Sequence, residues 1–181
     1  MISFNRFWDM PSSDTFDVLS IGNFVKKYLR ESKISIDPFA RNKRWATYTN
    51  DLNPETLAEY HMDAEDFCKM LQKKGVMADL IIFDPPYSPT QMKQCYDSIG
   101  IEHSDGGMNS RLYARVRKAF DPMVIKDGIV LTFGWNTHGM MTQRTYEIIE
   151  IMIICHGQAH NDTICMAERK CFEQHGFFFA Q

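Results

Sequence analysis

The residues with the clearest chemical meaning are Asp84-Pro85-Pro86-Tyr87, which directly follow the apolar segment 80–83. Two consecutive prolines fix φ and remove two backbone donors, so they predict a stiff turn with outward-pointing carbonyl groups. The Asp84 carboxylate and the Pro85 carbonyl would then offer two acceptors to an –NH2 group. Such acceptors suit the exocyclic amine of adenine, because they favour tetrahedral geometry at a nitrogen whose lone pair is delocalised. Tyr87 would supply a flat face for the base. The alternative is a structural proline-rich turn.

Three further carboxylates also follow predicted strands. Asp37 follows the segment 34–36, Asp51 follows 45–49, and Asp63 follows 60–62. In open α/β sheets, ligands bind at the carboxyl ends of the strands. We therefore expect these acids to lie with Asp84 along one edge of a sheet. Aspartate also caps helices at such turns, and we expect capping to explain one or two of the four positions.

The elements that position these residues alternate between strand and helix patterns. Continuous apolar runs predict buried strands at 78–83 and 128–133, followed by strands at 148–155 and 163–167. Helical spacing of apolar residues predicts helices at 21–30, 66–74 and 112–123. The segments 10–17 and 88–109 are expected to be loops. Because only the short turn 157–162 separates the last two strands, they must pair antiparallel. The pattern predicts a mostly parallel α/β sheet that ends in an antiparallel hairpin.

From residue 34 to residue 167 the chain resembles S-adenosylmethionine-dependent amino-methyltransferases, in particular DNA adenine-N6 methyltransferases, including small phage-type ones. Asp84 to Tyr87 match the catalytic motif of that family. The resemblance implies an α/β class I methyltransferase Rossmann-like fold with a mostly parallel seven-stranded sheet. It implies one domain over residues 1–181, and transfer of a methyl group from S-adenosylmethionine to N6 of adenine in DNA.

The same resemblance implies a set of cofactor-binding residues. The segment 37–39 resembles the start of the cofactor motif, the segment 50–53 resembles the acidic end of the second strand, where the family holds the ribose hydroxyls, and the segment 63–66 resembles the motif near the cofactor's adenine. The implied cofactor residues are Asp37, Pro38, Phe39, Arg41, Asn42, Asp51, Leu52, Asp63 and Ala64.

One departure from the family concerns the cofactor loop. The family normally continues Asp-Pro-Phe with a glycine pair, and glycine lets the backbone adopt φ > 0 and approach a ligand closely. Here the segment 40–44 contains no glycine. Either the side chains of Arg41 or Asn42 hold the methionine carboxylate of the cofactor, or the site is impaired and the protein binds without catalysing. The intact catalytic motif favours the first interpretation.

Little of the chain remains for substrate recognition, which is left to the loop 88–109 and the segment 4–17. We expect substrate contacts from Ser88, Trp135, His138, Arg111 and Arg115. The two arginines share one helix face with Lys118, although such a charge row is more often solvated. A second basic group is Arg41, Lys43 and Arg44. The partner would be DNA, either single-stranded or a duplex with the adenine flipped out, and a homodimer that grips DNA with two subunits is left open.

Composition limits the remaining classes of function. The chain has 181 residues and a formal net charge of −3, so basic surfaces must be local. We expect a cytoplasmic protein with reduced cysteines, because the five cysteines form no CxxC pair and no secretory or membrane-spanning segment is recognisable. No metal site is expected. The alternatives are an RNA base amino-methyltransferase, acting on adenine N6 or guanine N2, and a catalytically impaired binding protein with the same fold.

Overall fold

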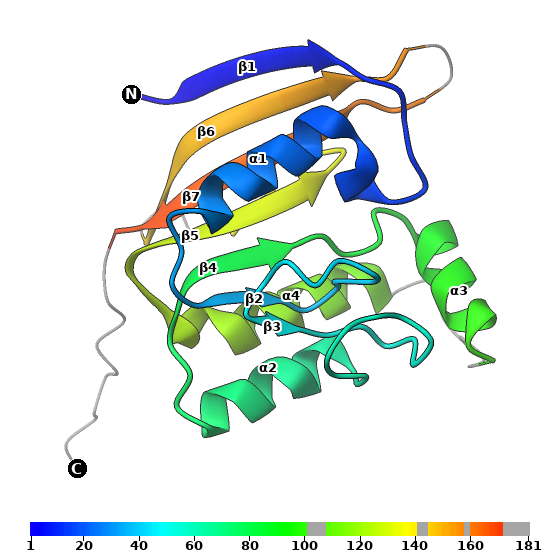
Figure 1. Cartoon of the computed structure of the whole chain (residues 1–181), viewed down its shortest axis with the longest axis vertical. Coiled ribbons are helices and arrows are strands. Elements are labelled where there is room, and N and C mark those ends of the chain that lie inside the picture. The colour runs from blue at the N-terminus through cyan, green and yellow to red at the C-terminus, as the bar shows by residue number, and fades with distance from the viewer. Residues whose placement is uncertain (101–107, 141–144, 158–159, 172–181) are drawn as a thin grey trace.

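The computed structural model describes residues 1–100, 108–140, 145–157 and 160–171. Its centre is a seven-stranded sheet with the strand order β1-β6-β7-β5-β4-β2-β3 (Figure 1). The strands are β1 (Ser3–Trp8), β2 (Ser35–Asp37), β3 (Tyr48–Thr49), β4 (Ala78–Phe83), β5 (Val124–Gly134), β6 (Tyr146–Cys155) and β7 (Thr163–Lys170). The helices are α1 (Leu19–Leu29), α2 (Ala64–Lys73), α3 (Pro89–Ser98) and α4 (Met108–Phe120), with short 3-10 turns η1 (Thr15–Asp17) and η2 (Asp121–Met123).

The pairing of the strands confirms the predicted sheet. β2 pairs parallel with β3 and β4, β4 pairs parallel with β5, and β1 pairs parallel with β6. β7 runs antiparallel to both of its neighbours, β5 and β6. The parallel strands therefore end at one edge of the sheet, where Figure 1 also places the start of α3 and the chain between β1 and α1.

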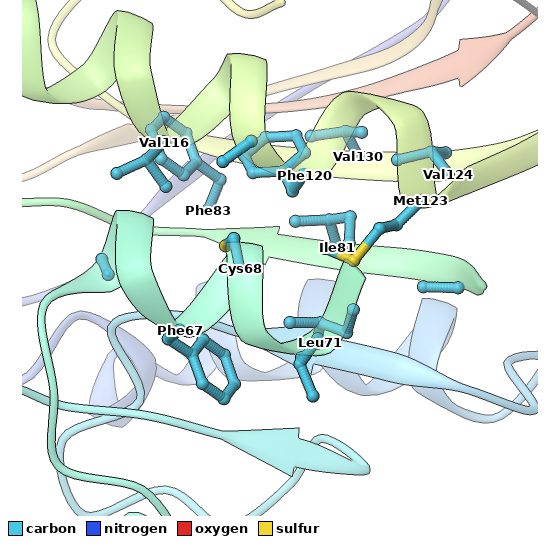
Figure 2. Packing of buried hydrophobic residues seen from close by; sticks show 14 of the residues in the cluster. Phe67, Cys68, Leu71, Ile81, Phe83, Val116, Phe120, Met123, Val124 and Val130 are labelled. Carbon is cyan, nitrogen blue, oxygen red and sulfur yellow. The ribbon is translucent and has the colours of Figure 1, made fainter. Parts of the chain in front are cut away.

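Helices cover the two faces of the sheet and form two apolar clusters. On one face, α2 and α4 pack against β4 through Phe67, Leu71, Val116 and Phe120, none of which is exposed (Figure 2). On the other face, α1 and η1 cover β4, β5 and β7, with Phe16 in edge contact with Phe133. Burial of these large side chains contributes roughly 1.5–3 kcal/mol each. Packing on both faces therefore stabilises the central strands whose ends carry the candidate site.

Three elements differ from the predicted ones. The segment 60–62 is not a strand, and its only pairing is a bridge between Asn50 and Tyr60. β1 takes the seventh place in the sheet and was not predicted, because its side chains are mostly exposed on both faces and show no alternation. The helix α3 lies inside the segment expected to be a loop, since Pro89 begins the helix, a position that proline favours. The rest of that segment, 101–107, lies outside the described residues.

None of the described helices is long and apolar enough to cross a membrane.

Candidate functional site

Asp84 stands at the carboxyl end of β4 and is the chemical centre of the site. Its Oδ1 accepts a hydrogen bond of 2.6 Å from the hydroxyl of Tyr87. Burial raises the pKa of Asp84 to about 6, although the hydrogen bonds from Tyr87 and Thr15 favour the charged form. Near neutral pH the carboxyl group is therefore mostly an acceptor, as the proposed grip on an amine requires.

The turn after Asp84 is fixed to α3 by a reciprocal pair of hydrogen bonds. The hydroxyl of Ser88 caps the helix by accepting from the backbone N–H of Gln91 over 3.2 Å. The side-chain oxygen of Gln91 in turn accepts from the backbone N–H of Tyr87 over 2.7 Å. This arrangement is close to a capping box. Ser88, predicted to touch substrate, therefore caps the helix here, and Gln91, which was not singled out, positions the backbone of Tyr87.

Two aromatic side chains meet at the carboxyl end of the sheet. The rings of Tyr87 and Trp135 make an edge contact with centroids 5.8 Å apart. Trp135 follows β5 and is 41% exposed, so part of its ring surface remains open beside Tyr87. His138 is also exposed, and its backbone N–H donates to the side chain of Asn136. Trp135 thus contacts the ring of Tyr87, and its place at the rim of a base pocket and its contact with a base stay predictions.

Asp37 ends β2 inside the protein and organises the loop that follows it. Its side chain is only 2% exposed and accepts from the backbone N–H of Phe39 over 3.0 Å. Burial raises its pKa well above the usual range, and the neighbouring carboxylates of Asp84 and Asp51 raise it further. The structure therefore brings these three acids close enough to influence one another, as expected for one edge of the sheet.

Asn50 was not predicted, yet it ties this edge together. It is fully buried, and its amide donates to the backbone carbonyls of Pro38 and Met62 while its oxygen accepts from the N–H of Met62. Three of the four hydrogen bonds that a side-chain amide can make are thereby used to join three segments. The sequence signal was available, since Asn50 directly precedes Asp51 at the end of a predicted strand.

The loop without glycine nevertheless reaches the left-handed region of backbone conformation. Arg41 has φ = 50°, a region that costs a residue with a Cβ roughly 1–2 kcal/mol. Two contacts hold it there: its N–H donates to Asp51 Oδ2 over 3.1 Å, and its guanidinium donates to the carbonyl of Ser13 over 2.6 Å. Asn42 accepts from the N–H of Leu57. In this structure both side chains thus join loops to one another.

The acids differ in what they bind. Asp63 accepts from the N–H groups of Glu65 and Asp66 and caps α2, and Ala64 lies in the core behind it. Asp51 accepts from the N–H of Asn53 as well as from Arg41, and burial raises its pKa. Helix capping thus explains one of the four acids, within the expected range. Roles for Asp51 at a ribose, with Leu52 beside it, and for Asp63 at an adenine stay predictions.

The two predicted basic groups have partners on the protein surface. Arg115 of α4 bonds to Glu65 of α2 over 3.0 Å, and Lys69 bonds to the same carboxylate. Lys43 bonds to Asp17 over 2.5 Å. The side chain of Arg111 lies outside the described part of the structure. For Arg115 the surface ion pair is the observed role, and contact with nucleic acid stays a prediction.

The segment 9–18, which we call the N-terminal loop, forms a wall of the site. The sequence leaves the segment 4–17 to substrate recognition but singles out none of its residues. The hydroxyl of Thr15 lies 3.4 Å from that of Tyr87. Phe16 is buried and stacks on Trp45 with centroids 5.8 Å apart. The loop begins at Asp9, whose carbonyl meets the ring of His156 at 2.9 Å. These contacts join residues far apart in sequence, so no local pattern could have revealed them.

Two buried hydroxyl groups lack a partner among the described residues. They belong to Tyr113 and Thr132. Burial raises the pKa of Tyr113 to about 12, and the nearby carboxylate of Asp84 contributes. A buried polar group without a partner is costly, so a polar ligand beside Asp84 would satisfy a group that the described protein leaves open. The described residues contain no cluster of three or more His, Cys, Asp or Glu side chains with metal-binding geometry.

Comparison with known proteins identifies the fold. No protein-family model and no curated sequence matches the chain. Among solved structures, a protein from Streptococcus mutans assigned as a SAM-dependent methyltransferase matches with a TM-score of 0.55 and 13% identity, over 81% of this chain and 48% of that one. TrmN from Thermus thermophilus matches with a TM-score of 0.53 and 11% identity, over 84% of this chain and 49% of that one.

A third structure matches over most of both chains. The N-methyltransferase NodS from Bradyrhizobium japonicum, solved with S-adenosyl-L-homocysteine, has a TM-score of 0.54 and 8% identity, over 88% of this chain and 89% of that one. The chain therefore spans about half the length of the first two proteins and most of the third. At these identities the likeness concerns the fold alone. The chain has the Rossmann-like fold of class I methyltransferases, as expected from the sequence.

Proposed function

We propose that the chain binds S-adenosylmethionine and transfers its methyl group to the exocyclic N6 amine of adenine in DNA. The observation that carries this proposal is the carboxylate of Asp84 at the end of β4, beside two aromatic rings and next to a rigid proline turn. The partly exposed Trp135 and the ring of Tyr87 provide the apolar surface on which a base would stack.

The cofactor site of this proposal fits the residues at the ends of β2 and β3. The backbone at Arg41 adopts the left-handed conformation that glycine provides in the family, so the loop shape survives the change of residue. Asp37, Phe39, Arg41 and Asp51 would hold the cofactor, with the open hydroxyl of Tyr113 as a further polar group nearby. Two structures of similar fold were solved with S-adenosyl-L-homocysteine, which supports this choice of cofactor.

The residues of the turn perform the remaining tasks. The cofactor, when bound, supplies an electrophilic methyl group. Asp84 and the carbonyl of Pro85 accept hydrogen bonds from the amine and localise its lone pair, and Pro86 keeps the turn stiff. Tyr87 orients the base by stacking. The amine loses its proton after the transfer, so the site needs no strong base.

A radioactive assay tests the proposal. The wild-type chain is incubated with tritiated S-adenosylmethionine and duplex DNA, single-stranded DNA or RNA, and the digested nucleosides are separated. We expect labelled N6-methyldeoxyadenosine from the wild type. In Asp84→Ala we expect the rate of methyl transfer to fall by about 100-fold or more. The matched control is Asp66→Ala, which removes an exposed carboxylate on α2.

The alternatives are outcomes of the same assay. Methylation of RNA alone would favour an RNA base amino-methyltransferase. Absence of methylation on all three substrates would favour a binding protein, and absence of calorimetric binding of S-adenosylmethionine would exclude the enzyme. An undiminished rate in Asp84→Ala would refute the catalytic role of Asp84.

A further inference from the structure

The hydroxyl of Tyr87 lies where the proposed reaction needs a different donor. It donates to Oδ1 of Asp84 over 2.6 Å. An amine N–H of a target base is the same kind of group and would approach a carboxylate at about 2.7–2.9 Å. In the free protein the partly buried carboxylate of Asp84 is therefore satisfied by one of the protein's own donors, at the turn proposed to bind the base.

Thr15 holds this tyrosine hydroxyl from the opposite side. A phenolic hydroxyl carries a single proton, and Tyr87 gives that proton to Asp84. In the 3.4 Å contact with Tyr87, Thr15 can therefore act only as the donor. Because Thr15 also lies within hydrogen-bonding reach of Asp84, the three side chains form one polar group in which both hydroxyls favour the charged carboxylate.

The N-terminal loop fixes Thr15 in this position. The residues on both sides of Thr15 are anchored: the carbonyl of Ser13 accepts from Arg41, and Asp17 bonds to Lys43. The adjacent Phe16 is buried against Trp45 and Phe133. Thr15 is thus presented by a segment with several independent attachments to the rest of the site.

Resting on the proposed function, we propose that the Tyr87 hydroxyl is an internal placeholder for the substrate amine, and that Thr15 is the positioning residue that keeps it there. A base that carries an amine replaces the displaced donor and leaves Asp84 satisfied. A base without an amine has no donor to offer Asp84, so the Tyr87 hydroxyl keeps its hydrogen bond to the carboxylate and no exchange takes place. The exchange of donors therefore occurs only with bases that carry an exocyclic amine.

Equilibrium binding to two matched oligonucleotides tests this inference. Both are fluorescent single strands of thymidines with one central base, either adenine or unsubstituted purine, which lacks the amine. Tyr87→Phe keeps the ring and removes the placeholder, so we expect it to tighten adenine binding by about fivefold or more and to change purine binding by less than about twofold. Thr15→Val should shift adenine binding in the same direction by a smaller factor, and Thr15→Ser should restore wild-type binding.

The outcomes separate this inference from the proposed function. Equal or weaker adenine binding by Tyr87→Phe, in a wild-type protein that does methylate adenine, overturns the placeholder alone. An equal gain for adenine and purine also overturns it, because the effect would then be steric. A gain restricted to adenine, in a wild-type protein that methylates nothing, supports the placeholder and contradicts the proposed function. Thermal melting of each variant confirms that the compared proteins are folded.

Discussion

The guanidinium of Arg41 lies 2.6 Å from the carbonyl oxygen of Ser13, so the loop after β2 and the N-terminal loop are joined by one side chain. The backbone of the same residue is bound to Asp51. One arginine thus connects the end of β2 to the segment that presents Thr15 to Tyr87.

The first prediction concerns this connection. Arg41→Ala and Arg41→Gly both remove the bond to Ser13, and we expect each to weaken calorimetric binding of S-adenosylmethionine by about 3- to 10-fold. Because glycine tolerates φ = 50°, Arg41→Gly should also be more stable than Arg41→Ala by about 1 kcal/mol in thermal unfolding. The control is Arg44→Ala, at an exposed position of the same loop. Equal loss in the control would contradict a specific role for Arg41.

The second prediction concerns the pH dependence of methyl transfer. Asp84 must be charged to accept hydrogen bonds from an amine, and burial raises its pKa to about 6. We expect kcat/KM to rise between pH 5 and pH 7 with a midpoint near that value. In Tyr87→Phe the midpoint should move upward, since the lost hydrogen bond favoured the charged form. A rate that is constant from pH 5 to pH 7 would argue against ionisation of Asp84 as the controlling step.

The third prediction concerns Glu168 on β7. This carboxyl group is buried, which raises its pKa to about 7, while the N–H of Met140 and the charge of Arg117 partly offset that effect. A raised pKa means that the folded state binds the proton more tightly than the unfolded state. The contribution of Glu168 to stability is therefore full below its unfolded pKa and declines as the pH rises through about 7.

Glu168→Gln keeps an acceptor for Met140 and removes the titration. We expect it to raise the free energy of unfolding at pH 8, relative to its effect at pH 4, by on the order of 1–3 kcal/mol. Urea titrations of wild type and variant at both pH values measure the difference. An identical change at the two pH values would show that the pKa of Glu168 is the same in the folded and the unfolded protein.

The fourth prediction concerns the close approach of Gly139 to the same carboxylate. A Cβ at Gly139 would lie 2.3 Å from Glu168 Oε2, and the residue has φ = 47°. Gly139→Ala should therefore lower the free energy of unfolding by roughly 2–4 kcal/mol through overlap and backbone strain together. Gly75→Ala is the control, because Gly75 has φ = 72° with open space around its Cβ position, and we expect a loss of about 1–2 kcal/mol there. Equal losses would mean that Glu168 moves aside freely.

The strands that could be predicted are those that sit deep in the sheet. β4 and β5 carry continuous apolar runs because both of their faces are covered, and the hairpin of β6 and β7 follows from a short polar turn. The edges of the sheet could not be predicted in the same way. β1 exposes side chains on both faces, so its composition does not indicate a strand although it forms one. The segment around Tyr60 has the composition of a strand but contributes only a single bridge.

The site shows the same division. The sequence places Asp84 and Tyr87 together because they lie within one turn, and it places Asp37 and Asp51 at the same edge through the parallel arrangement of their strands. It does not reveal Thr15, which reaches Tyr87 from a segment 72 residues away. Nor does it distinguish Asp63, bound to its own helix, from an acid that faces a ligand.

The pairing of β1 has a consequence for the order in which the protein is assembled. Ser3 pairs with Glu150, so β1 has no partner until β6 has been synthesised. Such long-range pairing slows folding, because the entropy of loop closure is lost before the contact contributes any stabilising free energy. The N-terminal loop is anchored at the same late stage, because Asp9 binds His156 beyond β6. A nascent chain therefore cannot complete the wall that carries Thr15 before His156 has emerged from the ribosome.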